Sequence, residues 1–136
     1  MMKKHAPLLT LAAVLSAAAC GDRPSETPAA PGVQRAAAAR VIEVKLVTDE
    51  KGNYFEPAEI TARTGDVLRL TLISGVHNLS FPADKNPAGA TLPARTDFLQ
   101  IAGQSVEVPV TMGPGRYVFQ CDPHSPFAMA GTLTVE

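Results

Sequence analysis

The chain has 136 residues, enough for one domain, and 46% of them are hydrophobic although aromatic residues are few and Trp is absent. Its formal net charge of −1 provides no basic excess, so we expect no nucleic-acid partner. The apolar run from Leu8 to Ala19 is too short for a membrane-spanning helix, which needs roughly twenty residues.

Residues 1–20 have the pattern of an export signal. Lys3 and Lys4 give a positive start, and the apolar run that follows ends in small residues. The alanines before Cys20 also resemble a bacterial lipoprotein signal, in which the Cys becomes the acylated N-terminus, although Ala17 stands where such signals usually have Leu. We therefore expect export to the periplasm or the outer cell-envelope surface. Two forms stay open: a lipid anchor on Cys20, or cleavage after an alanine that leaves a free thiol.

Residues 21–40 are rich in Pro, Ala, Ser, Glu and Arg and show no apolar periodicity, which predicts a disordered linker. If Cys20 is lipidated, the linker is a tether that holds the domain off a membrane, stiffened by Pro24, Pro28 and Pro31. Otherwise it is a disordered tail left by the export signal. The folded domain is expected to span residues 41–136.

Several segments of this domain alternate apolar and polar residues, as half-buried strands do. The apolar members of these segments are Ile42, Val44 and Leu46; Leu68, Leu70 and Leu72; Val106, Val108 and Val110; and Leu133 and Val135. Glycines at Gly65, Gly103, Gly113 and Gly115 mark turns between them. Many short strands separated by turns favour an all-β sandwich.

Residues 82–98 contain Pro82, Pro87, Gly89 and Pro93 and predict an irregular excursion with one short helical turn. Further along, Tyr117, Phe119 and Cys121 are spaced by two, so they share one face of a strand and the thiol emerges inward at its end. The prolines that follow Cys121 predict a tight loop there, and Gly131 releases the chain into the last strand.

Cys121, His124 and Met129 offer a thiolate, an imidazole and a thioether within nine residues. Soft ligands of this kind select copper. His77 is the remaining His outside the export signal and supplies a second imidazole. Two His, one Cys and a weak axial Met are the ligand set of a blue-copper electron-transfer centre.

Each candidate ligand, considered alone, could also have a role that does not involve a metal. Cys121 could be an inert buried thiol or form a disulfide with Cys20. His124 could be a surface residue, and Met129 could be core packing, with a Gln or backbone oxygen as the axial ligand instead. The shared spacing favours the copper site, because a disulfide would leave the His and Met positions unexplained.

Two stretches of the sequence carry a specific family resemblance. They are Gly115 to His124 with Met129 to Val135, and, upstream, Phe55 to Ile60, Gly65-Asp66-Val67 and His77-Asn78. Together they resemble plastocyanin-type cupredoxins over nearly all of residues 41–136. The resemblance implies a Greek-key β-sandwich of about eight strands with one type 1 copper ion near one end. It places His77, Cys121, His124 and Met129 on the ligand positions.

The resemblance also implies roles for residues around the copper. Asn78 would hydrogen-bond across to the loop that carries Cys121 and stiffen the site, although a turn Asn is the alternative. His124 would be exposed within an apolar docking patch, to which Pro82, Pro123, Pro126, Phe127 and the loop Met112-Gly113-Pro114 could contribute.

The expected function is one-electron transfer, without enzyme activity, because four protein ligands leave no position for a substrate. We expect a monomer that meets redox proteins, for instance a c-type cytochrome or a terminal reductase or oxidase. Residues 41–136 carry eleven acidic and seven basic side chains, a formal charge of −4 that would suit a basic partner. The alternative function is a copper carrier or storage module that cycles no electrons.

Two positions depart from the photosynthetic members of the family. Gln120 stands where they have a Tyr before the Cys, and Phe127-Ala128 stands where they usually have a Gly before the Met. These changes disfavour a plant-like photosynthetic partner and favour a bacterial respiratory or denitrifying chain.

Overall fold

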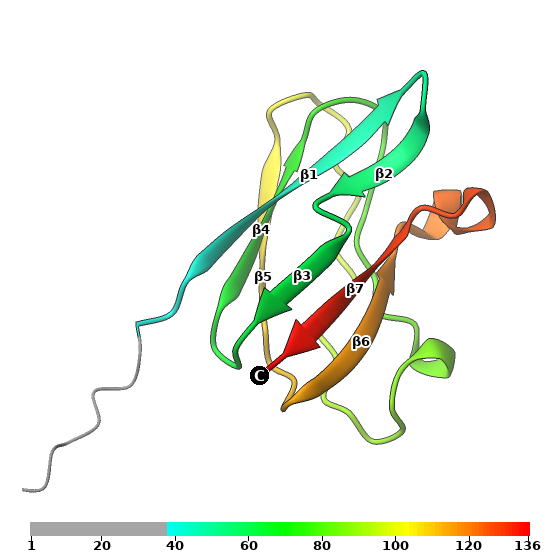
Figure 1. The fold of residues 1–136 in the computed structure, drawn as a ribbon. Coiled ribbons are helices and arrows are strands. Elements are labelled where there is room, and N and C mark those ends of the chain that lie inside the picture. Colours follow the sequence, from blue (N-terminus) through cyan, green and yellow to red (C-terminus); the bar gives the residue numbers. More distant parts are fainter. Residues whose placement is uncertain (1–37) are drawn as a thin grey trace, which may run out of the picture. The chain divides into compact units, whose positions relative to one another are not determined.

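The computed structural model in Figure 1 describes residues 38–136 of the chain. In this part the chain forms seven β-strands and two short 3-10 helices. In chain order they are β1 (Val41–Asp49), β2 (Gly52–Glu56), β3 (Glu59–Ala62), β4 (Val67–Leu72), η1 (Ala83–Lys85), β5 (Ser105–Pro109), β6 (Gly115–Gln120), η2 (Asp122–Phe127) and β7 (Ala130–Val135). The predicted export signal and most of the predicted linker lie outside the described residues and stay predictions.

The strands form two sheets, one with the order β2-β1-β4-β5 and the other with the order β3-β7-β6. β1 runs parallel to β4 and β3 runs parallel to β7, while the remaining neighbours are antiparallel. The chain changes sheet between β2 and β3, between β3 and β4 and between β5 and β6, as in a Greek-key β-sandwich. The all-β fold is confirmed, with seven described strands where about eight were expected. None of the helices in residues 38–136 has the length and apolarity needed to cross a membrane.

The alternating segments form strands as predicted. In β4, Leu68, Leu70 and Leu72 are buried, and the residues between them are more exposed. β1 buries Val44 and Leu46 in the same way. Because side chains on a strand point to opposite faces in turn, each strand delivers its apolar set to the space between the sheets. This alternation builds the core.

Between β4 and β5, residues 73–104 run as a long irregular connection, and the predicted helical turn within it is η1. Two isolated bridges tie this connection to the sandwich, His77 to Leu99 and Ser80 to Gln120. The second bridge joins the segment after His77 to the last residue of β6. Residues far apart in the sequence are thereby brought to the end of the sandwich where Cys121 lies.

Phe119 packs at the centre of the core, with no exposed surface. Its ring meets that of Phe55 edge-on, with centroids 4.9 Å apart, and that of Phe81 at 6.0 Å. Gly131 on β7 lies directly against the Phe119 ring, and any Cβ at this position would collide with the ring and with the Ala58 carbonyl. The predicted inward face of β6 is confirmed, since Tyr117, Phe119 and Cys121 are all buried.

At the start of β1, the buried Asp66 carboxylate accepts several hydrogen bonds. Arg40 donates from its backbone amide at 2.9 Å and from Nη2 at 2.8 Å, and the Arg63 amide donates at 2.9 Å. The side-chain hydrogen bond from Arg40, helped by the backbone donors, lowers the pKa of Asp66 to about 2. Residues directly before β1 are therefore joined to the turn that precedes β4.

We expect Asp66→Asn to destabilise the domain at neutral pH and to remove one part of its acid sensitivity. The folded-state pKa of Asp66 lies below the value of about 3.9 for an unfolded chain, so its stabilisation is complete above pH 4 and is lost as the pH falls toward 2. Denaturant unfolding from pH 7 to pH 2 should show the difference between wild type and variant closing over that window. The control is Asp84→Asn on the exposed η1 turn. If the free energies of unfolding of wild type and Asp66→Asn differed by a constant amount down to pH 2, the prediction would be contradicted.

Candidate metal centre

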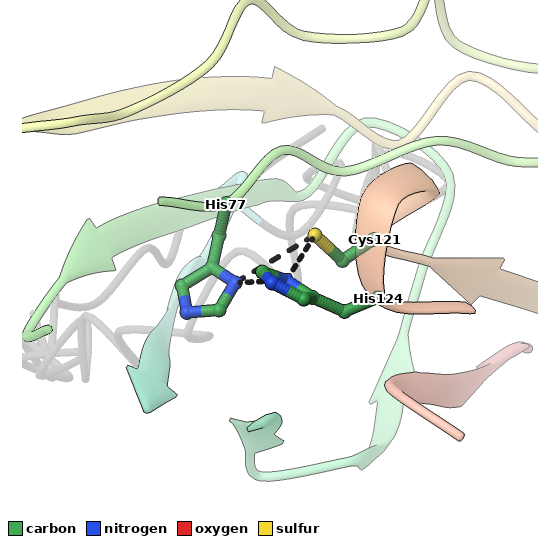
Figure 2. Close-up of side chains that lie close together, drawn as sticks. All are labelled: His77, Cys121 and His124. Carbon is green, nitrogen blue, oxygen red and sulfur yellow. Dashed lines mark hydrogen bonds between the residues drawn. The ribbon is translucent and has the colours of Figure 1, made fainter. Parts of the chain in front are cut away.

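Three donor atoms from distant parts of the chain converge in the folded protein, those of His77, Cys121 and His124, whose side chains Figure 2 shows. Nδ1 of His77 lies 3.1 Å from Nδ1 of His124, and the Cys121 Sγ lies 3.6 Å and 3.4 Å from these two nitrogens. A point equidistant from all three atoms is about 2.0 Å from each, which is the length of a metal–imidazole bond. The three atoms are therefore spaced to hold one metal ion in a trigonal arrangement.

Cys121 and His124 are placed by the end of β6 and the turn after it. β6 pairs with β7 up to Gln120 and Ala130, and the pairing continues as the Cys121 amide donates to the Met129 carbonyl at 3.1 Å. Between them η2 makes a compact loop that carries His124. The predicted tight loop is confirmed, and it returns Met129 to the side of Cys121.

Met129 is fully buried at the exit of this loop, and its amide donates to the His124 carbonyl at 3.2 Å. Ala128, directly before it, takes the left-handed conformation with φ of 62°, which favours Gly over residues with a Cβ. The family resemblance of the sequence implies a Gly at this position. The chain therefore keeps the sharp turn before Met129 with Ala in the place of Gly.

His77 comes from the long connection between β4 and β5. Its amide donates to the Leu99 carbonyl at 3.1 Å and its carbonyl accepts from the Leu99 amide at 2.8 Å, so the backbone is held on both sides. The side chain is fully buried, whereas that of His124 is partly exposed. The two imidazoles thus differ: one is an interior ligand candidate and the other reaches the surface.

Asn78 links the two segments of the site, as predicted. Its Nδ2 donates to Asp122 Oδ2 and its Oδ1 accepts from the Asp122 amide, both at 2.9 Å. Ser80 and Gln120 also donate to the Asp122 carboxylate. Partial burial would raise the pKa of Asp122, but the hydrogen bonds from Ser80, Asn78 and Gln120 outweigh it and lower that pKa. Asp122, which the sequence analysis missed, is the centre of the network beside Cys121.

Burial also changes the chemistry of the donors. It lowers the pKa of His77, helped by the nearby His124, while the Ser74 carbonyl acts in the opposite direction. It raises the pKa of Cys121, against the effect of the Asn78 and His124 backbone amides. Within residues 38–136, Cys121 is a free thiol. A lowered pKa favours the neutral imidazole of His77, which has a lone pair to offer, and a metal ion bound here would displace the thiol proton.

The surface beside His124 is apolar. A shallow hollow there is lined by Val76, Phe98, Gln100 and Pro123 together with His124 itself. Phe127, from the same loop as His124, is 72% exposed. Pro123 and Phe127 were predicted members of this surface, whereas Val76 and Phe98, which stand next to His77 and Leu99 in the chain, were not.

Two of the predicted patch members are wrong. Met112 is fully buried, and its loop precedes β6, whereas Cys121 follows the last residue of that strand. Six residues of β6 separate them, a rise of roughly 20 Å. Pro82 precedes η1, and Asn86, just after η1, is hydrogen-bonded to Val118 in the middle of β6, away from the metal centre. Strand direction, which turn residues alone do not reveal, decides both cases.

Both ends of the Gln120 side-chain amide are hydrogen-bonded. Its Oε1 accepts from Lys85 Nζ at 2.8 Å, and its Nε2 donates to Asp122 Oδ1 at 3.3 Å. Arg95 lies 3.6 Å from the same carboxylate. The position before Cys121 is therefore occupied by a polar side chain fixed between charged neighbours.

Residues 42–136 match the family of copper binding proteins, plastocyanin/azurin family. The plastocyanin of Prochlorothrix hollandica is 32% identical over 138 residues, covering 100% of this chain and 95% of that protein. Plastocyanin A/B of Petroselinum crispum is 35% identical over 96 residues, which is 68% of this chain and 98% of that protein. The solved oxidized plastocyanin of Dryopteris crassirhizoma is 34% identical with a TM-score of 0.56, and the match covers 70% of this chain and 100% of that one. The fold, the three converging donors and these matches agree: the chain belongs to the plastocyanin/azurin family of copper-binding proteins.

Proposed function

We propose that the protein is a one-electron carrier whose copper ion is held by His77, Cys121, His124 and Met129. The observation that carries this proposal is the convergence of two imidazole Nδ1 atoms and one thiol within 3.1–3.6 Å of one another. Met129, buried at the exit of the same loop, supplies the thioether. Bound copper supplies a one-electron couple between Cu(II) and Cu(I).

The donor types favour copper over other metals. A thiolate with a thioether is a soft set, and two imidazoles with one thiolate in a trigonal plane match the preference of copper. Structural zinc sites use four Cys or His ligands, and the described residues bring three such groups together here. Four protein donors leave no open position for a substrate, which supports a carrier over an enzyme.

The protein's part in electron transfer is to keep the donors in place. Asn78 and Asp122 join the segment of His77 to the loop of Cys121, and β6 and β7 close that loop from the other side. A site fixed by the surrounding structure changes little when the charge of its metal changes. Small rearrangement is what fast one-electron exchange requires.

Partners would meet the carrier at the hollow beside His124. This imidazole is the partly exposed donor, and Phe127 stands out from the same loop. A small apolar contact of this kind suits a transient redox partner that must dissociate quickly. We infer that the partners are redox proteins of a bacterial cell envelope, such as a c-type cytochrome or a terminal reductase or oxidase. We also infer that the carrier is a monomer.

The placement in the envelope rests on the sequence of residues 1–40. An export signal, Cys20 and a Pro-rich linker would give an exported domain, tethered by lipid if Cys20 is acylated. The mass of the mature N-terminal peptide tests this, because acylated Cys20 and an unmodified terminus have different masses. A retained residue 1 would contradict export.

The proposed function is tested by adding Cu(II) to the purified protein. We expect stoichiometric binding of one ion, intense visible absorption from the copper–thiolate bond, bleaching by ascorbate and recovery of the colour on reoxidation. A protein that stays colourless or weakly coloured would overturn the blue-copper assignment. A protein that binds copper but cannot be reduced and reoxidised without releasing it would favour the copper carrier instead.

A further inference from the structure

A hydroxyl group lies against the buried imidazole of His77 on the side away from the metal-facing nitrogen. Thr48 Oγ1 is 2.9 Å from His77 Nε2, and it also donates a hydrogen bond to Asn53 Oδ1 at 2.7 Å. Thr48 and Asn53 face each other across the β1–β2 hairpin, 29 and 24 positions before His77 in the chain. None of the sequence motifs for the metal centre includes these two residues.

The direction of the hydrogen bonds follows from counting protons. A Thr hydroxyl has one proton, and here it is used toward the Asn53 carbonyl oxygen. Oγ1 can therefore only accept from His77, so Nε2 carries the ring proton. In a neutral imidazole the other nitrogen, Nδ1, then holds the lone pair, and Nδ1 is the atom that faces Cys121 and His124.

Thr48 is itself held firmly. Its amide donates to Ser74 Oγ at 2.9 Å, and Ser74 Oγ donates back to the Thr48 carbonyl at 2.6 Å. This double contact ties β1 to the segment just before His77. The hydroxyl is thus fixed by the backbone as well as by Asn53, and a fixed acceptor orients a ring more effectively than a mobile one.

Gly75 provides the space for this contact. It has a φ of +86°, and a Cβ at this position would lie 2.7 Å from His77 Nε2 and would collide with Thr48 Oγ1. The backbone thus passes so close to both groups that only Gly leaves the hydrogen bond intact. The β1–β2 hairpin, the backbone at Gly75 and the His77 imidazole therefore all pack around the contact between Thr48 Oγ1 and His77 Nε2.

We propose that Thr48, oriented by Asn53, is a positioning residue that fixes the tautomer and ring orientation of His77 and thereby tunes the reduction potential of the centre. Outer hydrogen bonds to a ligating His raise its basicity and fix its tautomer. An acceptor at Nε2 makes Nδ1 a stronger donor, which favours Cu(II) over Cu(I). The effect on potential rests on the proposed copper site, whereas the effect on the tautomer does not.

The test compares Thr48→Val, which removes the hydroxyl at nearly constant shape, with Thr48→Ser, which keeps it. In the metal-free protein, ¹⁵N NMR should show the proton of His77 on Nε2 in wild type and Thr48→Ser. Thr48→Val should show a partial shift of the proton to Nδ1, partial because the Ser74 carbonyl also bonds to this imidazole. In the copper-loaded protein, loss of the acceptor should weaken Cu(II) binding relative to Cu(I) about tenfold. That ratio equals a rise in reduction potential of about 59 mV, which Thr48→Ser should largely prevent.

Two further variants serve as checks. Asn53→Ala frees the hydroxyl without changing Thr48 and should move both readouts in the same direction as Thr48→Val. Thr61→Val, at an exposed position on β3, should move neither. A wild-type proton on Nδ1, or a Thr48→Val protein with unchanged tautomer and potential, would overturn the proposal. Failure of wild type to bind copper would overturn the proposed function and leave the tautomer result standing.

Discussion

Cys121→Ser is expected to abolish the intense colour of the copper-loaded protein completely. The colour requires a thiolate bound to Cu(II), and Cys121 supplies the sulfur 3.4 Å and 3.6 Å from the two imidazole nitrogens. A Ser hydroxyl is a harder and much less acidic donor. Copper affinity should therefore fall by more than the roughly 10–100-fold that changes in outer hydrogen bonds cost. Titration with Cu(II), followed by visible absorption and by calorimetry, measures both effects.

The fold should survive this replacement, which makes the result interpretable. Cys121 is tied to β7 through its backbone amide, and Ser is close to Cys in size. Unchanged far-ultraviolet circular dichroism would establish this. A matched control is Ser125→Ala, in the same loop but without a metal-facing donor, which should keep the full colour. Retention of the intense band in Cys121→Ser would remove Cys121 from the ligand set.

Phe127→Asp is expected to slow electron transfer from the reduced protein to a small c-type cytochrome by tenfold or more. Phe127 is 72% exposed, so it contributes little to the core, but it stands on the loop of His124, where a partner would bury it. Burying such a side chain contributes about 1.5–3 kcal/mol, and about 1.4 kcal/mol corresponds to a factor of ten in affinity. Stopped-flow mixing at several cytochrome concentrations separates the affinity from the limiting rate.

Two further variants test whether the slower electron transfer of Phe127→Asp comes from the surface beside His124. Val41→Asp adds the same charge at another exposed apolar residue, at the far end of β1 roughly 23 Å from Thr48, and should leave the rate unchanged. Phe127→Ser removes the ring without adding charge and should retain most of the loss. Equal rates for Phe127→Asp and wild type would show that partners do not dock at the hollow beside His124.

Features that depend on neighbours in the chain could be predicted from the sequence. Leu68, Leu70 and Leu72 alternate with polar residues, and that period alone predicts a half-buried strand. Cys121 lies at the inward end of β6 because Tyr117 and Phe119 precede it at intervals of two. Even the contact of Asn78 was foreseen, although from a family resemblance and not from its spacing, and the structure confirms its two hydrogen bonds to Asp122.

Features that depend on which distant segments meet could not be predicted in this way. Pro82 and the loop at Met112 were assigned to the docking surface from their positions in the sequence. The direction of β6 places them away from the metal centre instead. Val76 and Phe98 were overlooked because nothing in their own neighbourhood shows that the bridge between His77 and Leu99 exposes them beside His124. The one signal in the sequence was the position of Val76, an apolar residue directly before the candidate ligand His77.

By itself, the sequence determined the strand pattern and the chemical nature of the site, since period-two alternation and a cluster of soft donors are local properties of a chain. The tertiary structure decided everything that requires distant residues to meet. It brought His77 across 44 positions to Cys121 with spacing suited to one metal ion, and it set Thr48 against the far side of that imidazole. The physical reason is that hydrogen bonds and packing between the two sheets, not the order of residues, fix such distances.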